Sequence, residues 1–251
     1  MAAYNAAQYL VKSLPAALAQ DYSNYEVILV DDGSSDNTEE IVSSFSQTKL
    51  HYINKGRLGS PSALNEAINA SSGEYIAIND ADDISKPCRL SYAVNFLKLN
   101  PEIVLLGTGY QIINKHPVNL SEIRGNILKD DHVKPRFYGP FQMYIANPFV
   151  HSTIVFPKNT WRKIGGYDEK LSMCVDYDFY LRAIKLGRAA FLPQETILFY
   201  KNVDSFFKKK TKREYIKTLI KIKMRARRNL QLPLWVIFYD IYNFYRIIRY
   251  Y

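Results

Sequence analysis

The chain has 251 residues, of which 47% are hydrophobic and 23% are charged; this balance fits one folded domain, with or without an appendage, and excludes a mainly disordered protein. Its net charge of +9 comes from residues 201–251, which carry 14 Lys and Arg against three acids and leave residues 1–200 at −2. A main domain of mild negative charge offers no basic groove for DNA or RNA, so we expect no nucleic-acid partner.

The first third of the chain alternates between strand and helix patterns. Strands are predicted at residues 25–30, 50–54 and 75–78, where runs rich in β-branched and aromatic residues end in turn-forming residues. Helices are predicted at 38–45 and 61–70, the second with Pro61 in its first turn. This alternation predicts a parallel sheet covered by helices.

The rest of the chain carries weaker patterns. A helix is predicted at 87–99, a strand at 103–106, a second strand at 153–156, and a helix at 175–186 that stops at Gly187. Residues 111–148 are polar and contain scattered prolines and glycines, which predicts loops and an antiparallel hairpin. The fold class is therefore α/β, a mostly parallel central sheet flanked by helices, followed by a helical C-terminal tail.

Carboxylates follow two of the predicted strands. Asp31 and Asp32 end the first, and Asp80 and Asp82 end the third. Ligands of an open parallel sheet bind at the carboxyl ends of its strands, and carboxylates placed close together repel one another unless a cation or a ligand lies between them. Hard oxygen ligands of this kind suit Mg²⁺ or Mn²⁺ beside a sugar diphosphate.

Several motifs occur in a fixed order from residue 3 to about residue 190. In this order and spacing the chain resembles the family 2 glycosyltransferases, which have the GT-A fold. The matching segments are Tyr4-Asn5, Asp31 to Thr38, Gly56 to Asn65, Gly73 to Ile76, Asp80 to Asp83, His151-Ser152, Gly165 to Glu169, and Asp176 to Asp178 with Leu181-Arg182.

The resemblance implies a Rossmann-like GT-A domain over residues 1–200, with a nucleotide-sugar-binding half at 1–105 and an acceptor-side half at 106–200. Residues 201–251 would form a basic, aromatic helical tail. The implied activity is the inverting transfer of a sugar from a nucleoside diphosphate sugar, with UDP as the expected nucleotide, to a hydroxyl acceptor.

Donor-side roles follow from the resemblance at matching positions. Asp32 or Asp31 would hold the base with Tyr4 beside it, and Asp80 would bind the ribose. Asp82 would bind a divalent metal ion, Mn²⁺ or Mg²⁺, that bridges the diphosphate. Arg57, in the glycine-containing loop, would add a second positive contact to the leaving group.

On the acceptor side, Asp176 matches the family's proposed general base. The preceding position is Val175, where the family has glutamate, and this departure leaves Asp178 as a substitute candidate. His151 and Gly166 belong to the acceptor-side pattern, although His151 as a structural histidine and the glycine pair as a simple turn are alternatives.

Two other readings stay open at this point. A nucleotidyltransferase would also use a parallel sheet and acidic metal ligands, but residues 4–14 lack the glycine-rich basic loop it would carry. A catalytically inactive sugar-nucleotide or carbohydrate-binding module is supported by Val175 and by the short N-terminus. Only Met1 to Ala3 precede Tyr4, so the first strand of the family is expected to be very short or to lack its beginning.

The C-terminal tail is basic over residues 206–228 and aromatic after Pro233. Polar residues interrupt the second stretch and make it too polar for a transmembrane span, namely Asp240, Asn243, Arg246 and Arg249. We therefore expect an interfacial helix and a peripheral membrane contact through residues 206–251. Membrane contact would suit a glycan or glycolipid acceptor in cell-surface polysaccharide assembly, whereas packing of the tail on its own domain or on a partner is the alternative.

Cys88 and Cys174 are too few to staple a fold and have no metal-ligand spacing. We expect both to be reduced thiols in a cytoplasmic protein. Residues 1–5 show no secretory signal. Together with the tail, this places the expected location at the inner face of a membrane.

Overall fold

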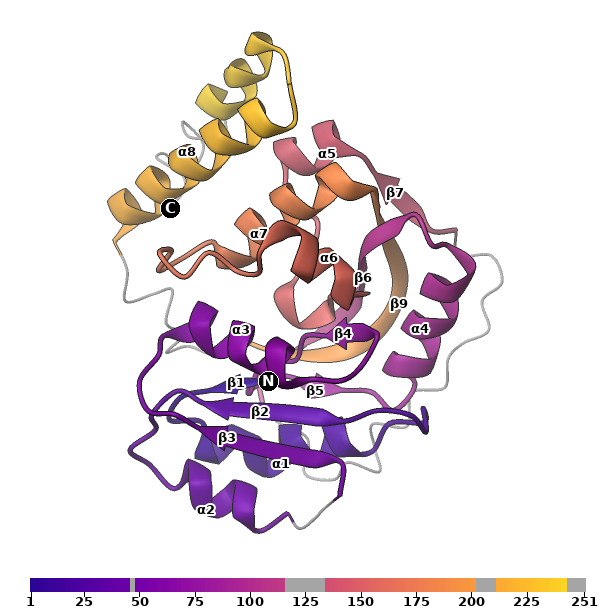
Figure 1. Cartoon of the computed structure of the whole chain (residues 1–251), viewed down its shortest axis with the longest axis vertical. Coiled ribbons are helices and arrows are strands. Elements are labelled where there is room, and N and C mark those ends of the chain that lie inside the picture. The colour runs from indigo at the N-terminus through magenta and orange to yellow at the C-terminus, as the bar shows by residue number, and fades with distance from the viewer. Residues whose placement is uncertain (46–47, 116–133, 202–210, 243–251) are drawn as a thin grey trace.

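The computed structural model describes residues 1–45, 48–115, 134–201 and 211–242, and its strands form two sheets (Figure 1). The first sheet contains β1 (Ala2–Ala3), β2 (Val27–Asp31) and β3 (Leu50–Asn54), all parallel and in that order. Strands β2 and β3 confirm that the predicted strands at 25–30 and 50–54 lie side by side in one parallel sheet. Asp31, the last residue of β2, pairs with Ala3, so Tyr4 leaves the sheet beside it.

Strand β2 is buried on both faces because helices cover each side of it. Val27 and Leu29 pack with α1 (Ala7–Leu18) and α2 (Thr38–Ser43), whereas Ile28 and Val30 pack with α3 (Ser60–Ala70). Successive side chains of a strand point to opposite faces, so a continuous apolar run fits this position. Helix α3 lies on the side of this sheet that faces α6 and α7 (Figure 1).

The second sheet is mixed and has the order β4 (Tyr75–Ala77), β8 (Val155–Pro157), β6 (Ile103–Ile113), β9 (Arg188–Tyr200), β5 (Ile84–Ser85). Strand β7 (Arg136–Tyr138) pairs with β9 on one side. The β6–β9 pair is parallel, while β8 runs antiparallel to both β4 and β6. Long, curved β6 and β9 form the spine of this sheet (Figure 1).

The third predicted strand does not join the first sheet, and this part of the prediction is wrong. Strand β1 has two residues and pairs only with the end of β2. Strand β4 instead pairs with β8. A cavity of about 470 Å³ is lined by Met1, Ile28 of β2 and Ile76 of β4, among others. The Met1 amine lies at this cavity and donates to the Ile28 carbonyl at 2.7 Å, and burial lowers the pKa of this amine to about 6.

Helices cover both faces of the second sheet. Helix α4 (Arg89–Leu99) packs on one face through Ala93 and Leu97. The opposite face carries the largest core cluster, which includes α5 (Pro140–Ile145) and α7 (Val175–Ala183). Helix α6 (Lys158–Ile164) and the short 3₁₀ helices η2 (His151–Thr153) and η3 (Ile184–Leu186) complete this layer.

Several elements differ from the sequence prediction. Helix α1 begins without a capping side chain and contains Pro15, so its sequence lacks helix start signals. Strand β9 contains Pro193, beside a register shift at Gly109 where a Cβ would meet the Pro193 carbonyl oxygen at 2.3 Å. Residues 111–113 continue β6, and β7 and α5 replace the predicted loops; the remainder, at 116–133, lies outside the described residues.

The tail begins, within the described part, with α8 (Lys212–Asn229). Thr211 caps it: the threonine hydroxyl accepts from the Glu214 amide, and the Glu214 carboxylate accepts from the Thr211 amide. A turn leads to η5 (Leu234–Val236) and helical residues 237–242, while residues 202–210 and 243–251, including the predicted polar positions 243, 246 and 249, lie outside the described residues. Across the four described ranges, no helix is both long enough and apolar enough to span a bilayer.

Candidate active site

Asp31 lies at the end of β2 and is buried. One carboxylate oxygen accepts hydrogen bonds from the Ser34 amide at 2.8 Å and from the Ser34 hydroxyl at 2.6 Å. The other accepts from the Tyr52 hydroxyl at 2.9 Å. Asp31 thus holds the turn after β2 and the neighbouring strand β3, and a nucleotide base would meet a carboxylate that is already oriented.

Asp32 anchors the glycine-containing loop. Its Oδ1 accepts from the amides of Leu58 and Gly59 at 2.6 and 2.7 Å, and its Oδ2 lies 3.2 Å from Nη1 of Arg57. The Arg57 guanidinium also stacks over the Tyr4 ring, 3.6 Å from its centroid. The structure therefore brings Tyr4, Asp32 and Arg57 together, with the half-exposed Tyr4 and Arg57 side chains outermost.

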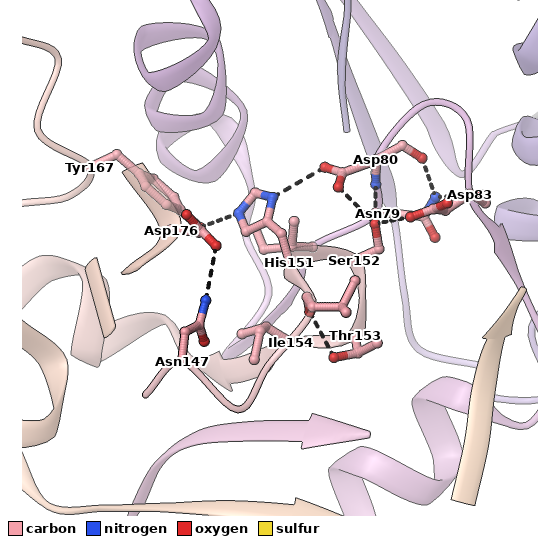
Figure 2. A network of polar contacts seen from close by, with 12 residues as sticks. Asn79, Asp80, Asp83, Asn147, His151, Ser152, Thr153, Ile154, Tyr167 and Asp176 are labelled. Atoms are coloured by element: carbon pink, nitrogen blue, oxygen red, sulfur yellow. Dashed lines mark hydrogen bonds and ion pairs between the residues drawn. The ribbon is translucent and has the colours of Figure 1, made fainter. Parts of the chain in front are cut away.

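Asp80 follows β4 and faces η2 across the end of the second sheet (Figure 2). Its Oδ1 lies 3.1 Å from Nδ1 of His151, and its Oδ2 accepts from the Ser152 hydroxyl at 2.8 Å. The Ser152 oxygen also hydrogen-bonds the carboxyl group of Asp83, which is buried and accepts from the Tyr200 amide. The predicted donor residue Asp80 and acceptor residue His151 are thus in direct contact.

The charges in this network shift one another's pKa values. Burial opposes ionisation of Asp80, but His151 and Ser152 outweigh it and lower the Asp80 pKa. Burial would likewise lower the pKa of His151, yet the neighbouring Asp80 raises it overall. Burial and the adjacent Asp80 charge raise the pKa of Asp83 to about 8, so this carboxyl is mostly protonated at neutral pH. The network therefore sets Asp80 with a lowered pKa beside Asp83 with a raised one, and His151 contacts the first of them.

Asp82 lies on the same loop and is partly exposed. Among the residues that the structure describes, no group of three or more His, Cys, Asp and Glu side chains could enclose a metal ion by itself. Mg²⁺ and Mn²⁺ need only one or two carboxylates when phosphate oxygens and water supply the other ligands. Asp82 stays the predicted metal ligand, and its single carboxylate would need a bound diphosphate and water to complete the coordination.

The other nitrogen of His151 points to the acceptor side. Its Nε2 lies 3.0 Å from the Tyr167 hydroxyl, and the ring stacks edge-on against the Tyr167 ring at 5.9 Å. Asp176, in the first turn of α7, lies beside Tyr167 and accepts from the Asn147 amide at 3.3 Å (Figure 2). Asp176 also raises the pKa values of His151 and Tyr167 through its charge, after larger effects of burial and, at His151, of Asp80. Asp80 and Asp176 thus flank one imidazole.

Asp178, the substitute candidate for the base, points away from this network. It is buried, 1% exposed, and pairs with Arg182 at 2.8 Å and with Arg225 of α8. Arg225 also binds Asp168 at 2.8 Å. The structure therefore uses Asp178 to attach the tail, and leaves Asp176 as the α7 carboxylate that faces His151.

Gly166 occupies a left-handed conformation with φ +73°. A Cβ there would lie 2.6 Å from Oδ1 of Asn65, so only glycine lets the α3 side chain approach. The Asn65 amide group accepts from the Tyr167 amide at 2.8 Å and donates to the Tyr167 carbonyl at 2.9 Å. Gly166 acts here through the backbone, because its lack of a side chain lets Asn65 of α3 hold the loop that carries Tyr167.

Arg89 is the main residue of the network that the sequence did not reveal. It is 2% exposed, and its guanidinium donates to the carbonyls of Ile78 and Ser152, to Asn79 Oδ1 and to Ser85 Oγ. It thereby joins the end of β4 to η2, beneath Asp80 and His151. Arginine is mostly exposed in folded proteins, so an arginine at the start of a helix is predicted to face water, and nothing in the sequence indicates that Arg89 is buried.

Comparison with known proteins places this geometry in a family. The chain is 33% identical over 196 residues to the uncharacterized glycosyltransferase RT0329 of Rickettsia typhi, covering 75% of this chain and 58% of that relative. It is 30% identical over 213 residues to the uncharacterized glycosyltransferase MJ1057 of Methanocaldococcus jannaschii, covering 82% and 71%. The chain thus spans little more than half of the rickettsial relative.

Solved structures share the fold. Residues 1–349 of S. aureus TarS, in complex with UDP-GlcNAc, superpose with a TM-score of 0.71 at 18% identity over 90% of this chain and 64% of that one. The mannosyltransferase PcManGT of Pyrobaculum calidifontis, in complex with GDP-Man and Mn²⁺, gives 0.65 at 21% identity over 90% and 62%. The family model for glycosyl transferase family 2 matches residues 1–162. Because that match covers well over half of the chain, this protein belongs to glycosyl transferase family 2 and has the GT-A fold.

Proposed function

We propose that this chain is an inverting glycosyltransferase that moves a sugar from a nucleoside diphosphate sugar, first of all a UDP-sugar, to a hydroxyl acceptor. The observation that carries the proposal is the position of His151. One ring nitrogen reaches Asp80 of the predicted donor side, and the other reaches Tyr167, beside Asp176 of the acceptor side (Figure 2). Donor and acceptor residues from distant parts of the chain therefore meet at one centre.

Residues 1–105 would form the donor half. Tyr4 and Arg57 would cover the base and contact the diphosphate, with Asp32 holding their loop in place. Asp82 would hold Mn²⁺ or Mg²⁺ together with the diphosphate oxygens. A divalent ion at this position, when bound, supplies positive charge that stabilises the departing nucleoside diphosphate.

Residues 106–200 would form the acceptor half. The acceptor oxygen attacks the anomeric carbon while Asp176 takes its proton, and the bond from that carbon to the phosphate oxygen breaks, which inverts the configuration in one displacement. Asn147 orients the Asp176 carboxylate, and the Asp80 charge holds His151 and Tyr167 in line with it. No covalent intermediate with the protein is needed.

The donor class is supported by relatives of the same fold, since the TarS complex contains UDP-GlcNAc and the PcManGT complex contains GDP-Man and Mn²⁺. The acceptor we favour is a glycan or glycolipid in cell-surface polysaccharide or glycolipid assembly. We place the protein in the cytoplasm at the inner face of a membrane, and the basic charge of residues 201–251 supports this location.

Donor binding can be tested by thermal shift with a panel of sugar nucleotides, with and without Mn²⁺. A donor at roughly a hundred times its Kd stabilises the fold by about 2.7 kcal/mol. We expect Asp82→Asn to abolish the Mn²⁺-dependent part of this shift, while the exposed control Asp21→Asn keeps it. An unchanged shift in Asp82→Asn would remove the metal assignment.

Turnover can be tested by release of nucleoside diphosphate from the donor that binds. Asp176→Asn should keep the thermal shift and lower kcat by about 10²- to 10⁴-fold, the usual contribution of a general base. Asp178→Asn, by contrast, should lower the melting temperature and retain most of kcat in the remaining folded protein. Donor binding without any turnover in the wild type would identify an inert sugar-nucleotide-binding module, and pyrophosphate release from a nucleoside triphosphate would identify a nucleotidyltransferase.

A further inference from the structure

The C-terminal tail is attached to the main body by one face of α8. Leu219, Ile222 and Ala226 lie on this face and belong to the largest core cluster, as does Val236 from the following segment. These positions are spaced by three and four residues, so they form a single apolar stripe along the helix. Helix α8 therefore packs on the main body through this stripe.

A buried ion pair fixes the second helical segment against the first. Nζ of Lys223 lies 2.7 Å from Oδ1 of Asp240, and the other oxygen of Asp240 accepts from the Tyr144 hydroxyl of α5. Asp240 is one of the polar residues that interrupt the apolar stretch after Pro233, and it is 7% exposed and neutralised by Lys223. Residues 211–242 contain two acids, Asp240 and Glu214 at the N-terminal cap of α8. The burial of Asp240 takes one of these two negative charges off the exposed surface of the tail.

The outer face of α8 combines basic and apolar side chains. Lys217, Lys221 and Arg228 are exposed on it, and Ile220 and Met224 lie between them. The five side chains share one shallow surface with Arg225 and Asn229. Lysine and arginine can extend their charged ends to lipid phosphates while their methylene groups lie on an apolar surface.

The second segment exposes large apolar side chains at nearly every position that does not face inward. Phe238 is 72% exposed and Trp235 50% exposed, although large aromatic residues are usually buried. Seven exposed large hydrophobic residues fall within residues 234–242, namely Leu234, Trp235, Ile237, Phe238, Tyr239, Ile241 and Tyr242. Tryptophan and tyrosine are the residues that favour the boundary between lipid and water.

We infer that the outer face of α8 and the exposed residues of 234–242, together called the tail surface, bind an anionic lipid bilayer. Exposed basic residues complement lipid phosphates, and the adjacent aromatic side chains would enter the headgroup region. Exposing so many apolar side chains to water costs free energy, and a lipid surface would remove this cost by covering them. A nucleic acid would contact the basic residues but would leave these apolar side chains in water. The membrane location in the proposed function needs such a surface, but lipid binding can be measured without any sugar transfer.

The test uses the full chain, because Leu219, Ile222 and Val236 are core residues and a truncation would damage the main body. The chain is sedimented with vesicles of phosphatidylcholine alone and with vesicles that also contain phosphatidylglycerol. We expect binding to the second and not to the first, with loss at high salt because the attraction is partly between charges. Absence of binding to the anionic vesicles would overturn the inference.

Two pairs of variants separate the tail surface from general charge and hydrophobicity. Lys217→Glu/Lys221→Glu should weaken vesicle binding at least about 30-fold, because each basic residue near an anionic surface contributes about 1 kcal/mol and two of them are lost. The control Lys98→Glu/Lys185→Glu makes the same charge change at exposed lysines of α4 and η3 and should bind like the wild type.

The second pair addresses the apolar part of the tail surface. Phe238→Ser should weaken binding about tenfold or more, whereas Leu99→Ser, at an 82% exposed leucine outside the tail, should not. Equal binding by each variant and its control would overturn the inference. So would a concentration-dependent dimer that forms without vesicles and is abolished by Phe238→Ser, because the tail surface would then bind a second copy of the chain.

Discussion

The buried pair between Lys223 and Asp240 yields the most quantitative prediction. The Lys223 side chain is 5% exposed and that of Asp240 is 10% exposed. Lys223→Met keeps the apolar stem but leaves the Asp240 carboxylate in the interior, where the Tyr144 hydroxyl is its remaining side-chain partner among the described residues. Removing one member of a buried pair typically costs about 3–5 kcal/mol, because the remaining charge is desolvated without compensation.

For a chain of this size, a loss of about 3 kcal/mol lowers the melting temperature by roughly 6–12 °C. Circular dichroism or a dye-based melt measures this shift, with Lys221→Met, two residues away on the exposed side of α8, as the control expected within about 0.5 kcal/mol of the wild type.

The double variant Lys223→Met/Asp240→Asn completes the cycle. The side-chain amide oxygen that replaces the Asp240 carboxylate can still accept from the Tyr144 hydroxyl, and no charge is left buried. Most of the stability lost in Lys223→Met should therefore be recovered. If Lys223→Met melts like its control, or if the double variant is as unstable as the sum of its single changes, the pair does not hold the tail in place as described.

Two further predictions concern the site and its attachment to the tail. Gly33→Ala should destabilise the fold by about 2 kcal/mol or more and reduce the thermal shift caused by the donor. The reason is that Gly33 has φ +75° and a Cβ there would lie 2.8 Å from the Arg57 amide nitrogen. An unchanged donor shift would show that the turn tolerates a side chain. Arg225→Met should destabilise the fold more at neutral pH than in acid. Burial opposes ionisation of Asp168, but its hydrogen bond to Arg225 lowers the Asp168 pKa below the ordinary 3.8. An acid with a lowered pKa stabilises the fold at pH values above its unfolded-state pKa, and this stabilisation is lost as the pH falls through its folded-state pKa. The difference in unfolding free energy between wild type and variant, measured in urea melts, should therefore shrink below about pH 4. A difference that does not change with pH would contradict this.

Much of the donor half follows from local sequence. The apolar run before Asp31, the turn glycine Gly33 and the strand at residues 50–54 predict the parallel sheet because a strand buried on both faces needs a continuous apolar stretch. The order of motifs also led to the family, since each motif lies at a strand end or loop where its chemistry can reach a ligand. These are properties that neighbouring residues express together.

The acceptor half depended on contacts between distant segments. Nothing near Asp178 in the sequence shows that Arg225, 47 residues away, neutralises it and leaves Asp176 facing His151. The same holds for Asp240, because nothing near it in the sequence shows that Lys223 and Tyr144 bind its carboxylate. Helix α1 and the Pro193-containing strand β9 likewise depend on distant segments, because α1 packs on the first sheet and β9 pairs with β6.

The sequence by itself thus determined the fold class, the carboxylates at the ends of the early strands and the basic character of the tail, because periodicity, turn residues and charge are written in adjacent positions. Only the tertiary structure decided which acids face the proposed reaction centre and which are neutralised inside the protein. The physical reason is that the charge state and orientation of a buried carboxylate depend on the partner that meets it in space, and that partner lies elsewhere in the chain.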